Sequence, residues 1–294
     1  MATKRLTRDA LAALMSCIDT VLLDADGVLW HGNQAIPGSP EVVQKFRDQG
    51  KDVFMVSNNS GHSRKDYAAK CQRLQYNIDA DHLITTSALL AEYLKERDFT
   101  GKVYVVGGSG IREELDLVGI SNVGCGSDNL DHYSSKHELY NLPVDSDIAA
   151  VAVGFDAHFS YVKLMKATCY LHNPDCLFIA TNDDPTFPGP TISLPGSGSL
   201  VAAVKVASGR QPVILGKPYS ALVESIKKKH GLDPARTLMI GDRCGTDIKF
   251  ANDHGFHSLL VLTGVTSLQQ LESLPSADVV PEYYTEALSD LLKL

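Results

Sequence analysis

The sequence predicts an α/β protein in which a parallel β-sheet is interrupted by a second, inserted α/β domain. Short β-branched and apolar runs alternate along the chain with stretches of helical periodicity, as in βαβ units. The chain has 294 residues, of which 44% are apolar, so it can form one large or two ordinary domains around a buried core. Turn-rich segments near residues 100 and 209 mark the expected domain boundaries.

The first 99 residues are expected to start the sheet. Ser39 as N-cap and Pro40 as first helical residue mark the beginning of one helix, and Gly50 lies beyond its end. Ser63 with Asp66 forms a capping-box pattern for the next helix. The remaining elements expected here are strands at residues 18–23 and 53–56 and a helix at 87–95.

Residues 100–209 are predicted to form the inserted domain, and residues 210–294 to return to the first sheet. The first domain is therefore discontinuous, with ranges 1–99 and 210–294. The expected strands of the insertion are 103–106, 148–153 and 177–180, and its helices are 161–171 and 199–207. The last segment is expected to add strands at 213–215, 238–240 and 259–262 and helices at 220–230 and 246–254.

Four apolar runs of the predicted core end at a polar cluster. The carboxyl ends of parallel strands meet at one edge of a sheet, where ligands bind, so these clusters are expected to share one crevice. Asp247 lies about one helical turn beyond the last of them. The clusters are Asp24-Ala25-Asp26-Gly27, Ser57-Asn58-Asn59, Gly216-Lys217-Pro218 and Gly241-Asp242-Arg243.

This set of side chains indicates a site for a divalent cation and a phosphate group. Two carboxylates at 4 Å repel by about 4 kcal/mol at an effective dielectric constant near 20, and a hard cation removes that repulsion. Carboxylates without histidine or thiolate partners suit Mg²⁺, which also binds phosphate oxygens. Lys217, Ser57 and backbone N–H groups beside Gly27 and Asn58 would hold the remaining phosphate oxygens.

The ordered motifs resemble those of the haloacid dehalogenase (HAD) superfamily phosphatases. They are Asp24-x-Asp26-Gly27-Val28-Leu29-Trp30, Ser57-Asn58-Asn59, Lys217 and Gly241-Asp242-Arg243-x-x-Thr246-Asp247. The insertion, with Val153-Gly154-Phe155-Asp156, resembles the C2-type cap of the 4-nitrophenylphosphatase branch, which includes phosphoglycolate, glycerol-3-phosphate and pyridoxal phosphatases. The resemblance runs from about residue 17 to the end of the chain, and it implies a Rossmann-like HAD core with an inserted C2-type cap.

The resemblance also implies a role for each matching residue. Asp24 is the nucleophile that becomes an aspartyl phosphate, and Asp26 is the general acid and base. Asp24, the backbone carbonyl of Asp26 and Asp242 would bind Mg²⁺, and Asp247 would orient its water ligands. The residues that would hold the phosphoryl group are Gly27, Ser57, Asn58, Asn59 and Lys217.

The cap segment at residues 181–190 is expected to select the substrate, through Thr181, Asn182, Asp183 and Phe187. Pyridoxal phosphatases tend to have a histidine where Phe187 falls, so 2-phosphoglycolate or glycerol 3-phosphate is favoured, with 4-nitrophenyl phosphate as a further substrate. Pyridoxal 5′-phosphate remains the alternative. A second alternative is a non-catalytic protein that binds a phosphorylated metabolite, which would be expected to have lost one of the motif residues.

Composition excludes several other partners. The formal charge of −8 and the pI near 5.6 argue against nucleic acid, and the absence of an 18-residue apolar run argues against a membrane. Six cysteines without C-x-x-C pairs favour a reducing, cytoplasmic location, although Cys244 beside the fourth motif is a candidate for oxidation. The ten histidines show no metal-ligand spacing. The resemblance implies a homodimer formed through the cap.

Overall fold

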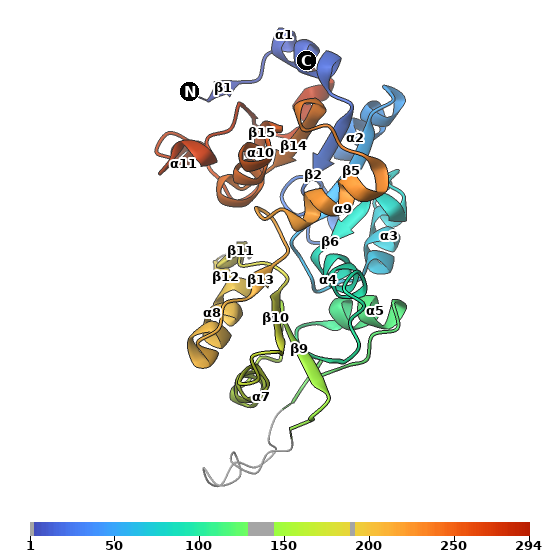
Figure 1. The fold of residues 1–294 in the computed structure, drawn as a ribbon. Helices are drawn as coiled ribbons and strands as arrows, with labels where there is room; N and C mark the ends of the chain where they lie inside the picture. Colours follow the sequence, from blue (N-terminus) through green and yellow to red (C-terminus); the bar gives the residue numbers. More distant parts are fainter. Residues whose placement is uncertain (1–2, 129–143, 189–191) are drawn as a thin grey trace. The chain divides into compact units, whose positions relative to one another are not determined.

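A computed structural model describes residues 3–128, 144–188 and 192–294 (Figure 1). The chain divides into two compact units. Unit 1 comprises Met1–Ser57, Lys65–Ile84 and Lys217–Leu294, and unit 2 comprises Asn58–Arg64 and Thr85–Gly216. The predicted insertion, residues 100–209, lies wholly within unit 2, and its assignment as an inserted cap stays a prediction. Residues 189 and 190 of the expected specificity segment lie outside the described residues.

Unit 1 is built on a seven-stranded sheet with the strand order β1-β16-β15-β14-β2-β5-β6. Every neighbouring pair from β1 to β5 is parallel, which confirms the predicted parallel sheet. Leu23, the last residue of β2, lies beside Ile240 of β14. The strands are β1 (Lys4–Arg5), β2 (Thr20–Leu23), β5 (Asp52–Ser57), β6 (Leu83–Thr85), β14 (Thr237–Gly241), β15 (His257–Val261) and β16 (Tyr283–Thr285).

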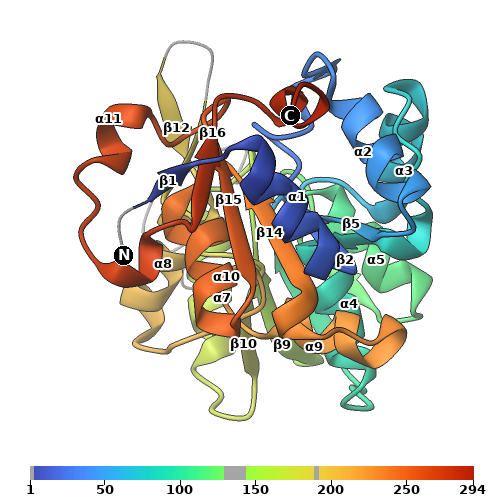
Figure 2. The same ribbon diagram turned by 90° about the horizontal axis from the view of Figure 1, so that it is seen from above.

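Helices flank both sides of this sheet (Figure 2). They are α1 (Arg8–Cys17), α2 (Ser39–Asp48), α3 (Arg64–Arg73), α9 (Ala221–His230), α10 (Lys249–His254) and α11 (Leu268–Leu271). Short 3₁₀ turns cover Ala80–His82, Pro234–Arg236, Ala277–Val279 and Leu288–Leu292, and a π-helical turn covers Cys244–Ile248. A small antiparallel hairpin joins β3 (Trp30–His31) to β4 (Gln34–Ala35). The predicted helix at 246–254 is thus a π turn followed by α10.

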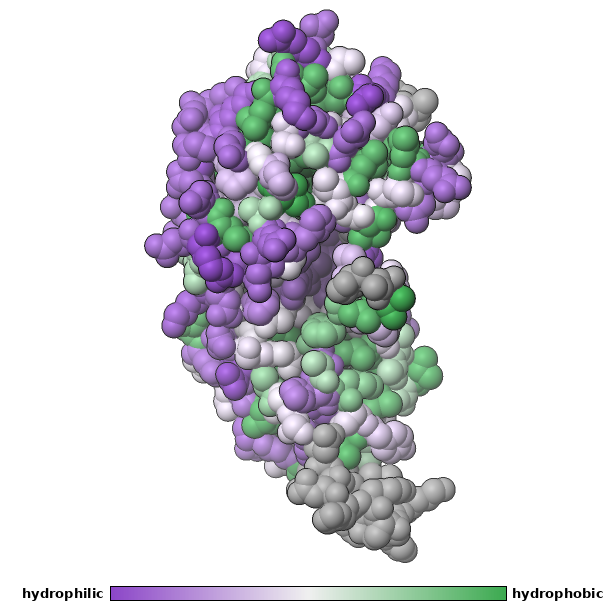
Figure 3. All heavy atoms as spheres, turned by 180° about the vertical axis from the view of Figure 1, so that it is seen from behind, coloured by the Kyte–Doolittle hydropathy of each residue, from purple (hydrophilic) through white to green (hydrophobic). Residues whose placement is uncertain are grey.

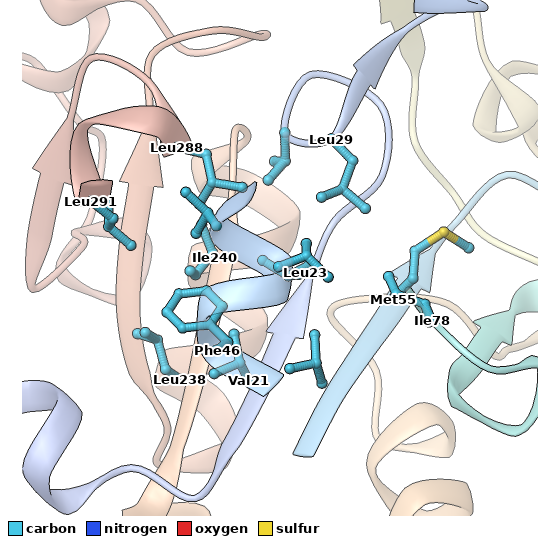
Figure 4. Packing of buried hydrophobic residues seen from close by; sticks show 14 of the residues in the cluster. Val21, Leu23, Leu29, Phe46, Met55, Ile78, Leu238, Ile240, Leu288 and Leu291 are labelled. Carbon is cyan, nitrogen blue, oxygen red and sulfur yellow. The ribbon is translucent and has the colours of Figure 1, made fainter. Parts of the chain in front are cut away.

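The main hydrophobic core of unit 1 lies on one face of the sheet. Alternate residues of a strand point to the same face, so Val21 and Leu23 of β2 contribute to the same buried cluster. Phe46 of α2 fills the space beside Val21 and Leu238 (Figure 4). Leu260 of β15 belongs to a second cluster, with side chains of the π turn.

Unit 2 contains a five-stranded parallel sheet with the order β13-β10-β9-β7-β8. Side chains of α7 and α8 pack with those of β9 and β10 in its core. The strands are β7 (Lys102–Val106), β8 (Asn122–Val123), β9 (Ile148–Val153), β10 (Leu177–Ala180) and β13 (Val213–Ile214), and β11 (Thr186–Pro188) forms a hairpin with β12 (Ser193–Pro195). The helices are α4 (Thr86–Lys95), α5 (Ser109–Leu117), α7 (Tyr161–Leu171) and α8 (Ser197–Ser208).

Two local predictions are wrong. The strand expected at 213–215 does not join the first sheet, because Val213 and Ile214 pair with β10 in the second sheet. A short apolar run carries no information about which sheet it completes, and Val213 is 46% exposed, as suits an edge strand. Ser39 is not the N-cap of α2: Gly38 is, with φ at 83°, and the Ser39 hydroxyl donates instead to a backbone carbonyl.

Hydrophilic side chains cover most of the face of unit 1 seen in Figure 3. Large exposed apolar side chains occur in both units, with Val206 at 86% exposure the most open of them. Among the described residues, none of the helices combines the length and the hydrophobicity that crossing a bilayer requires.

Two leucines of one short segment provide a test of this core. Leu288 is fully buried and Leu292 is 42% exposed. We expect Leu288→Ala to lower the free energy of unfolding by about 2–5 kcal/mol, because it removes buried methyl groups and leaves a cavity. Leu292→Ala is the matched control and should cost less than about 1 kcal/mol. Urea denaturation measures both, and equal losses would contradict the packing described here.

Candidate active site

Two carboxylates lie at the carboxyl ends of neighbouring strands in unit 1. Asp24 follows β2 and Asp242 follows β14, and the Asp24 amide continues the ladder by donating to the carbonyl of Ile240 at 2.9 Å. This places the two side chains at one edge of the sheet, as the strand order requires. The carboxylate oxygens of Asp24, Asp242 and Asp247 lie within 4.8 Å of one another.

The Lys217 ammonium group is buried among these carboxylates. Its Nζ lies 2.5 Å from Asp24 Oδ1 and 2.8 Å from Asp247 Oδ1, and it donates to the carbonyl of Val56 in β5 at 3.0 Å. Its side chain is 1% exposed. Burial alone would lower the pKa of Lys217, but Asp24 and Asp247 outweigh burial and raise it, so the ammonium stays charged.

The backbone around Asp242 and Asp247 fixes both side chains. Asp242 Oδ2 accepts a 2.7 Å hydrogen bond from the amide of Val265, in the loop after β15. Asp247 Oδ2 accepts from the amides of Asp242 and Arg243, at 3.2 and 3.1 Å. These bonds span the start of the π turn, a helix type found often at functional sites. The carboxylates are therefore held by main chain and not by neighbouring side chains alone.

Three glycines have no side chain and so make room for the carboxylates of Asp242 and Asp247. A Cβ on Gly264 would lie 1.8 Å from Asp242 Oδ2, and one on Gly27 would lie 2.6 Å from the same atom. A Cβ on Gly241 would lie 2.1 Å from Asp247 Cβ. Gly27 also has φ at +89°, a conformation that other residues rarely adopt. Glycine is thus required at these positions by close approach.

Asp26 lies in the turn after β2, and its carboxylate is oriented by Trp30. The indole Nε1 donates to Asp26 Oδ1 at 3.0 Å. The Trp30 ring is fully buried, stacks on Tyr67 with ring centroids 6.1 Å apart, and lies 4.0 Å below the Lys70 ammonium. A rigid aromatic cluster therefore fixes one oxygen of the Asp26 carboxylate and leaves the other available.

The other predicted phosphate ligands are placed as follows. Ser57 ends β5 and is buried. Asn58 and Asn59 belong to unit 2. The side-chain Nδ2 of Asn58 donates to Asp184 Oδ2 at 2.7 Å, and Asn59 Oδ1 accepts from the backbone N–H of Gly61 at 2.9 Å. The role of these residues, and of Gly27, in phosphate binding stays a prediction.

The predicted specificity residues also belong to unit 2. Thr181 and Asn182 are buried, and the Asn182 amide donates to Asp184 Oδ2 at 2.7 Å, the same oxygen that Asn58 contacts. Phe187 packs edge-to-face against Phe155, with centroids 5.3 Å apart. Asp183 is partly buried beside them. Their assignment as specificity residues stays a prediction.

Sequence reasoning missed three parts of this arrangement. The loop 263–266 follows β15, and its Val265 amide binds Asp242; the rule that polar clusters follow strands could have found it. Trp30 was expected to pack in the loop after Asp24, but its hydrogen bond to Asp26 was not predicted, and Asp184 was not singled out. Neither contact leaves a signal in sequence spacing, because both depend on side-chain direction.

The carboxylate cluster fits a divalent cation. Burial raises the pKa of Asp24 well above its usual value, although Lys217 opposes the rise, and burial together with Asp247 raises the pKa of Asp242 to about 7. One ammonium therefore does not offset the cost of keeping the carboxylates ionised. An all-oxygen ligand set of this charge is what hard divalent cations bind.

Comparison with known proteins identifies the family. Residues 21–121 match the sequence model described as haloacid dehalogenase-like hydrolase, and residues 214–291 match a second one described as HAD-hydrolase-like. A glycerol-3-phosphate phosphatase from Mus musculus is 38% identical to this chain, over 98% of the chain and 94% of the relative. The chain belongs to the haloacid dehalogenase-like hydrolases.

Further HAD relatives are similar to this chain in sequence or in fold, and one of them was solved with a bound divalent cation. The chloroplastic phosphoglycolate phosphatase 1A of Arabidopsis thaliana is 38% identical over 99% of this chain and 81% of its own length. The solved p-nitrophenyl phosphatase of Archaeoglobus fulgidus is 26% identical with a TM-score of 0.80, covering 94% of this chain and 99% of that one. A glycerol phosphate phosphatase of Mycobacterium tuberculosis, solved in complex with magnesium, is 28% identical with a TM-score of 0.75, covering 95% and 77%.

Cys244 in the π turn of this HAD chain is not a reactive thiol. It is 5% exposed, and burial raises the pKa of its thiol to about 11. The thiolate is the reactive species in oxidation, so a thiol that stays protonated is a poor target.

The raised pKa of Asp242 predicts how stability depends on pH without metal. Folded Asp242 has a pKa of about 7 and keeps its proton below that pH, whereas in the unfolded chain it loses the proton near the ordinary aspartate pKa of 3.8. The folded state therefore binds more protons between these limits, and stability falls as pH rises through this window, by up to about 4 kcal/mol.

Unfolding should be measured in EDTA from pH 4 to 8 for the wild type and for Asp242→Asn. The difference between the two proteins isolates this carboxyl from all others. We expect the wild type to lose stability relative to the variant as pH rises, and Mg²⁺ to cancel the loss. A constant difference across the range would contradict the described burial.

Proposed function

We propose that this HAD hydrolase is a Mg²⁺-dependent phosphomonoester hydrolase that acts on small phosphorylated metabolites through an aspartyl phosphate on Asp24. The observation that supports it most is the buried Lys217 ammonium 2.5 Å from Asp24, beside Asp242 and Asp247. A carboxylate that a buried ammonium holds at the end of a central strand, and that a bound divalent cation keeps ionised, is a positioned nucleophile.

The reaction has two steps on this site. An Asp24 carboxylate oxygen attacks phosphorus, so that a new O–P bond forms while the ester P–O bond breaks, and Asp26 gives its proton to the leaving oxygen. Asp26 then accepts a proton from the water that attacks the phosphoaspartate and releases inorganic phosphate and Asp24. The hydrogen bond from Trp30 leaves one Asp26 oxygen to carry that proton.

Asp24, the backbone carbonyl of Asp26 and Asp242 would hold Mg²⁺, and Asp247 would orient its water ligands. When bound, Mg²⁺ offsets the carboxylate charge and withdraws electron density from the phosphoryl group. Lys217 keeps Asp24 oriented and neutralises part of the phosphoryl charge. Gly27, Ser57, Asn58 and Asn59 are the proposed contacts for the remaining phosphoryl oxygens.

The favoured substrates are glycerol 3-phosphate and 2-phosphoglycolate. Relatives at 38% identity across nearly the whole chain are named for these two activities, but chronophin of Rattus norvegicus, a pyridoxal phosphatase, is 39% identical, so identity does not separate the two readings. Phe187 supports the choice, because its ring packs on Phe155 and offers no hydrogen bond to a polar aromatic substrate. Thr181, Asn182 and Asp183 are the proposed polar contacts to the substrate. Pyridoxal 5′-phosphate is the alternative substrate.

Metal dependence and the nucleophile are tested together. We expect Mg²⁺-dependent release of 4-nitrophenol from 4-nitrophenyl phosphate, loss of turnover in EDTA, and at least about a 10³-fold fall for Asp24→Asn, since the reaction then has no nucleophile. Asp9→Asn, which changes an exposed carboxylate of α1, is the matched control and should keep full activity. Undiminished turnover in Asp24→Asn would refute the mechanism, and binding without turnover in the wild type would favour a non-catalytic protein.

The substrate class is decided by a separate kinetic panel. The three esters to compare are glycerol 3-phosphate, 2-phosphoglycolate and pyridoxal 5′-phosphate. We expect kcat/KM to be higher for one of the first two than for the third, and the reverse order would establish the alternative.

Trp30→Phe tests how the proton is delivered. The variant keeps an aromatic ring but loses the hydrogen bond to Asp26. We expect kcat/KM for glycerol 3-phosphate, a poor leaving group, to fall about tenfold, which equals roughly 1.4 kcal/mol and is the order of one hydrogen bond to a charged group. The value of kcat/KM for 4-nitrophenyl phosphate should change less, because its leaving group needs little protonation. We expect the same difference between the two substrates for Asp26→Asn.

The matched control is Tyr76→Phe. Tyr76 meets Trp30 edge-on, with centroids 5.6 Å apart, and its hydroxyl bonds to the Leu29 carbonyl instead of to Asp26. Its loss can loosen the aromatic cluster but should leave the ratio between the two substrates unchanged. If Trp30→Phe slows both substrates equally, the indole has no role in proton delivery.

A further inference from the structure

Unit 1 has a second group of metal-ligating side chains, at the opposite end of β5. Asp52 begins β5, His82 ends the 3₁₀ turn before β6, and His230 ends α9. Each of the three residues offers one ligand atom, and these three atoms lie within 4.8 Å of one another. Ser57 at the other end of the same strand belongs to the candidate active site, so this second cluster is separated from that site by the length of β5.

The imidazole rings of His82 and His230 both pack against the ring of Phe54. The buried ring of Phe54, also in β5, lies 4.7 Å from the His82 ring and 4.9 Å from the His230 ring, between centroids. The two imidazole centroids are 5.1 Å apart. None of the three ligating residues is buried, so an ion has access from solvent.

The spacing suits a first-row divalent ion. His82 Nε2 lies 2.8 Å from Asp52 Oδ1. Ligand atoms around a tetrahedral zinc ion are about 3.3 Å apart, because bonds to nitrogen and oxygen are close to 2.0–2.2 Å long. The separation of His82 Nε2 and Asp52 Oδ1 is slightly shorter than this value, and the ligand atoms all lie within 4.8 Å of one another, so small side-chain rotations would bring the three atoms to it.

The far nitrogen of His82 lies near a carboxylate without bonding to it, and a small shift that closes this gap would give it the environment of a metal-ligating histidine. Its Nδ1 atom is buried and has no hydrogen-bond partner among the described residues. Asp79 Oδ2 lies 4.0 Å away, and Arg47 holds this carboxylate through a contact of 3.2 Å. Metal-bound histidines usually donate their second ring N–H to a carboxylate of this kind, which fixes the tautomer.

We propose that Asp52, His82 and His230 form a binding site for Zn²⁺, distinct from the site proposed for Mg²⁺. Two imidazoles with one carboxylate are ligands for zinc and related transition metals, whereas Mg²⁺ takes oxygen ligands only. The ion joins the start of β5, the turn before β6 and the end of α9, so it links three chain segments of unit 1. A water molecule takes the fourth position.

Cobalt spectroscopy tests this site without reference to activity. Bound metal is first removed from the protein with a chelator. Millimolar Mg²⁺ is then added to fill the all-oxygen site, and the protein is titrated with Co²⁺. We expect an intense visible band of tetrahedral Co²⁺ that saturates at one ion per chain and is displaced by Zn²⁺. Zn²⁺ should also raise the melting temperature by a few degrees when it exceeds its dissociation constant about a hundredfold.

Variants connect the signal to the residues. His82→Gln and His230→Gln should each weaken Co²⁺ binding at least about tenfold, the loss expected for one ligand. His257→Gln is the matched control, because His257 forms a similar 2.7 Å pair with Glu282 in the same unit but has no place in the cluster. It should bind Co²⁺ as the wild type does. Equal melting temperatures in EDTA establish that the variants are folded.

Three outcomes would overturn the proposal. They are a weak octahedral spectrum in the wild type, a sulfur-to-cobalt charge-transfer band that indicates cysteine ligands, and unchanged binding in both histidine variants. None of these measurements uses a phosphate ester, so the outcome is independent of the proposed phosphatase activity.

Discussion

The buried ammonium of Lys217 is the interaction on which the rest of unit 1 depends. It joins the residue after β2, the carbonyl of Val56 in β5 and the π turn after β14, and it is itself the first residue of the last segment of the unit. A buried charge is costly without partners, so the chain has to bring these distant segments together around it. The same requirement orients Asp24, which links the stability of the fold to the chemistry of the site.

The fold class and the centre of the site could be predicted because both follow from one geometric rule. Parallel strands end at a common edge, so Asp24 after β2 and Asp242 after β14 had to be neighbours once the strands were recognised. Lys217 lies beside Asp24 as expected, although the expected reason is wrong, since the strand before it completes the second sheet. The Val265 loop obeys the same rule and was overlooked, because its residues, Thr-Gly-Val-Thr, include no charged side chain and bind Asp242 through a backbone amide.

Side-chain partners could not be predicted in the same way. Asp26 has an indole partner four residues away, and Asn58 pairs with an aspartate 126 positions further along the chain. Histidine spacing gave no sign of the cluster around Phe54, because its three ligands come from separate elements that only the folded sheet brings together. Local patterns report which face of an element is buried, but the choice among polar partners is made by packing.

The glycines beside the carboxylates have a consequence for how this protein can change. At Gly27, Gly241 and Gly264 the only available space is that of a hydrogen atom, so every substitution places carbon where a carboxylate or its backbone already lies. Mutation therefore cannot adjust the charge cluster by small steps at these positions. Phe187, the proposed specificity residue, belongs to unit 2 and lies outside this cluster, so under our proposal diversification towards new esters proceeds at side chains of that kind.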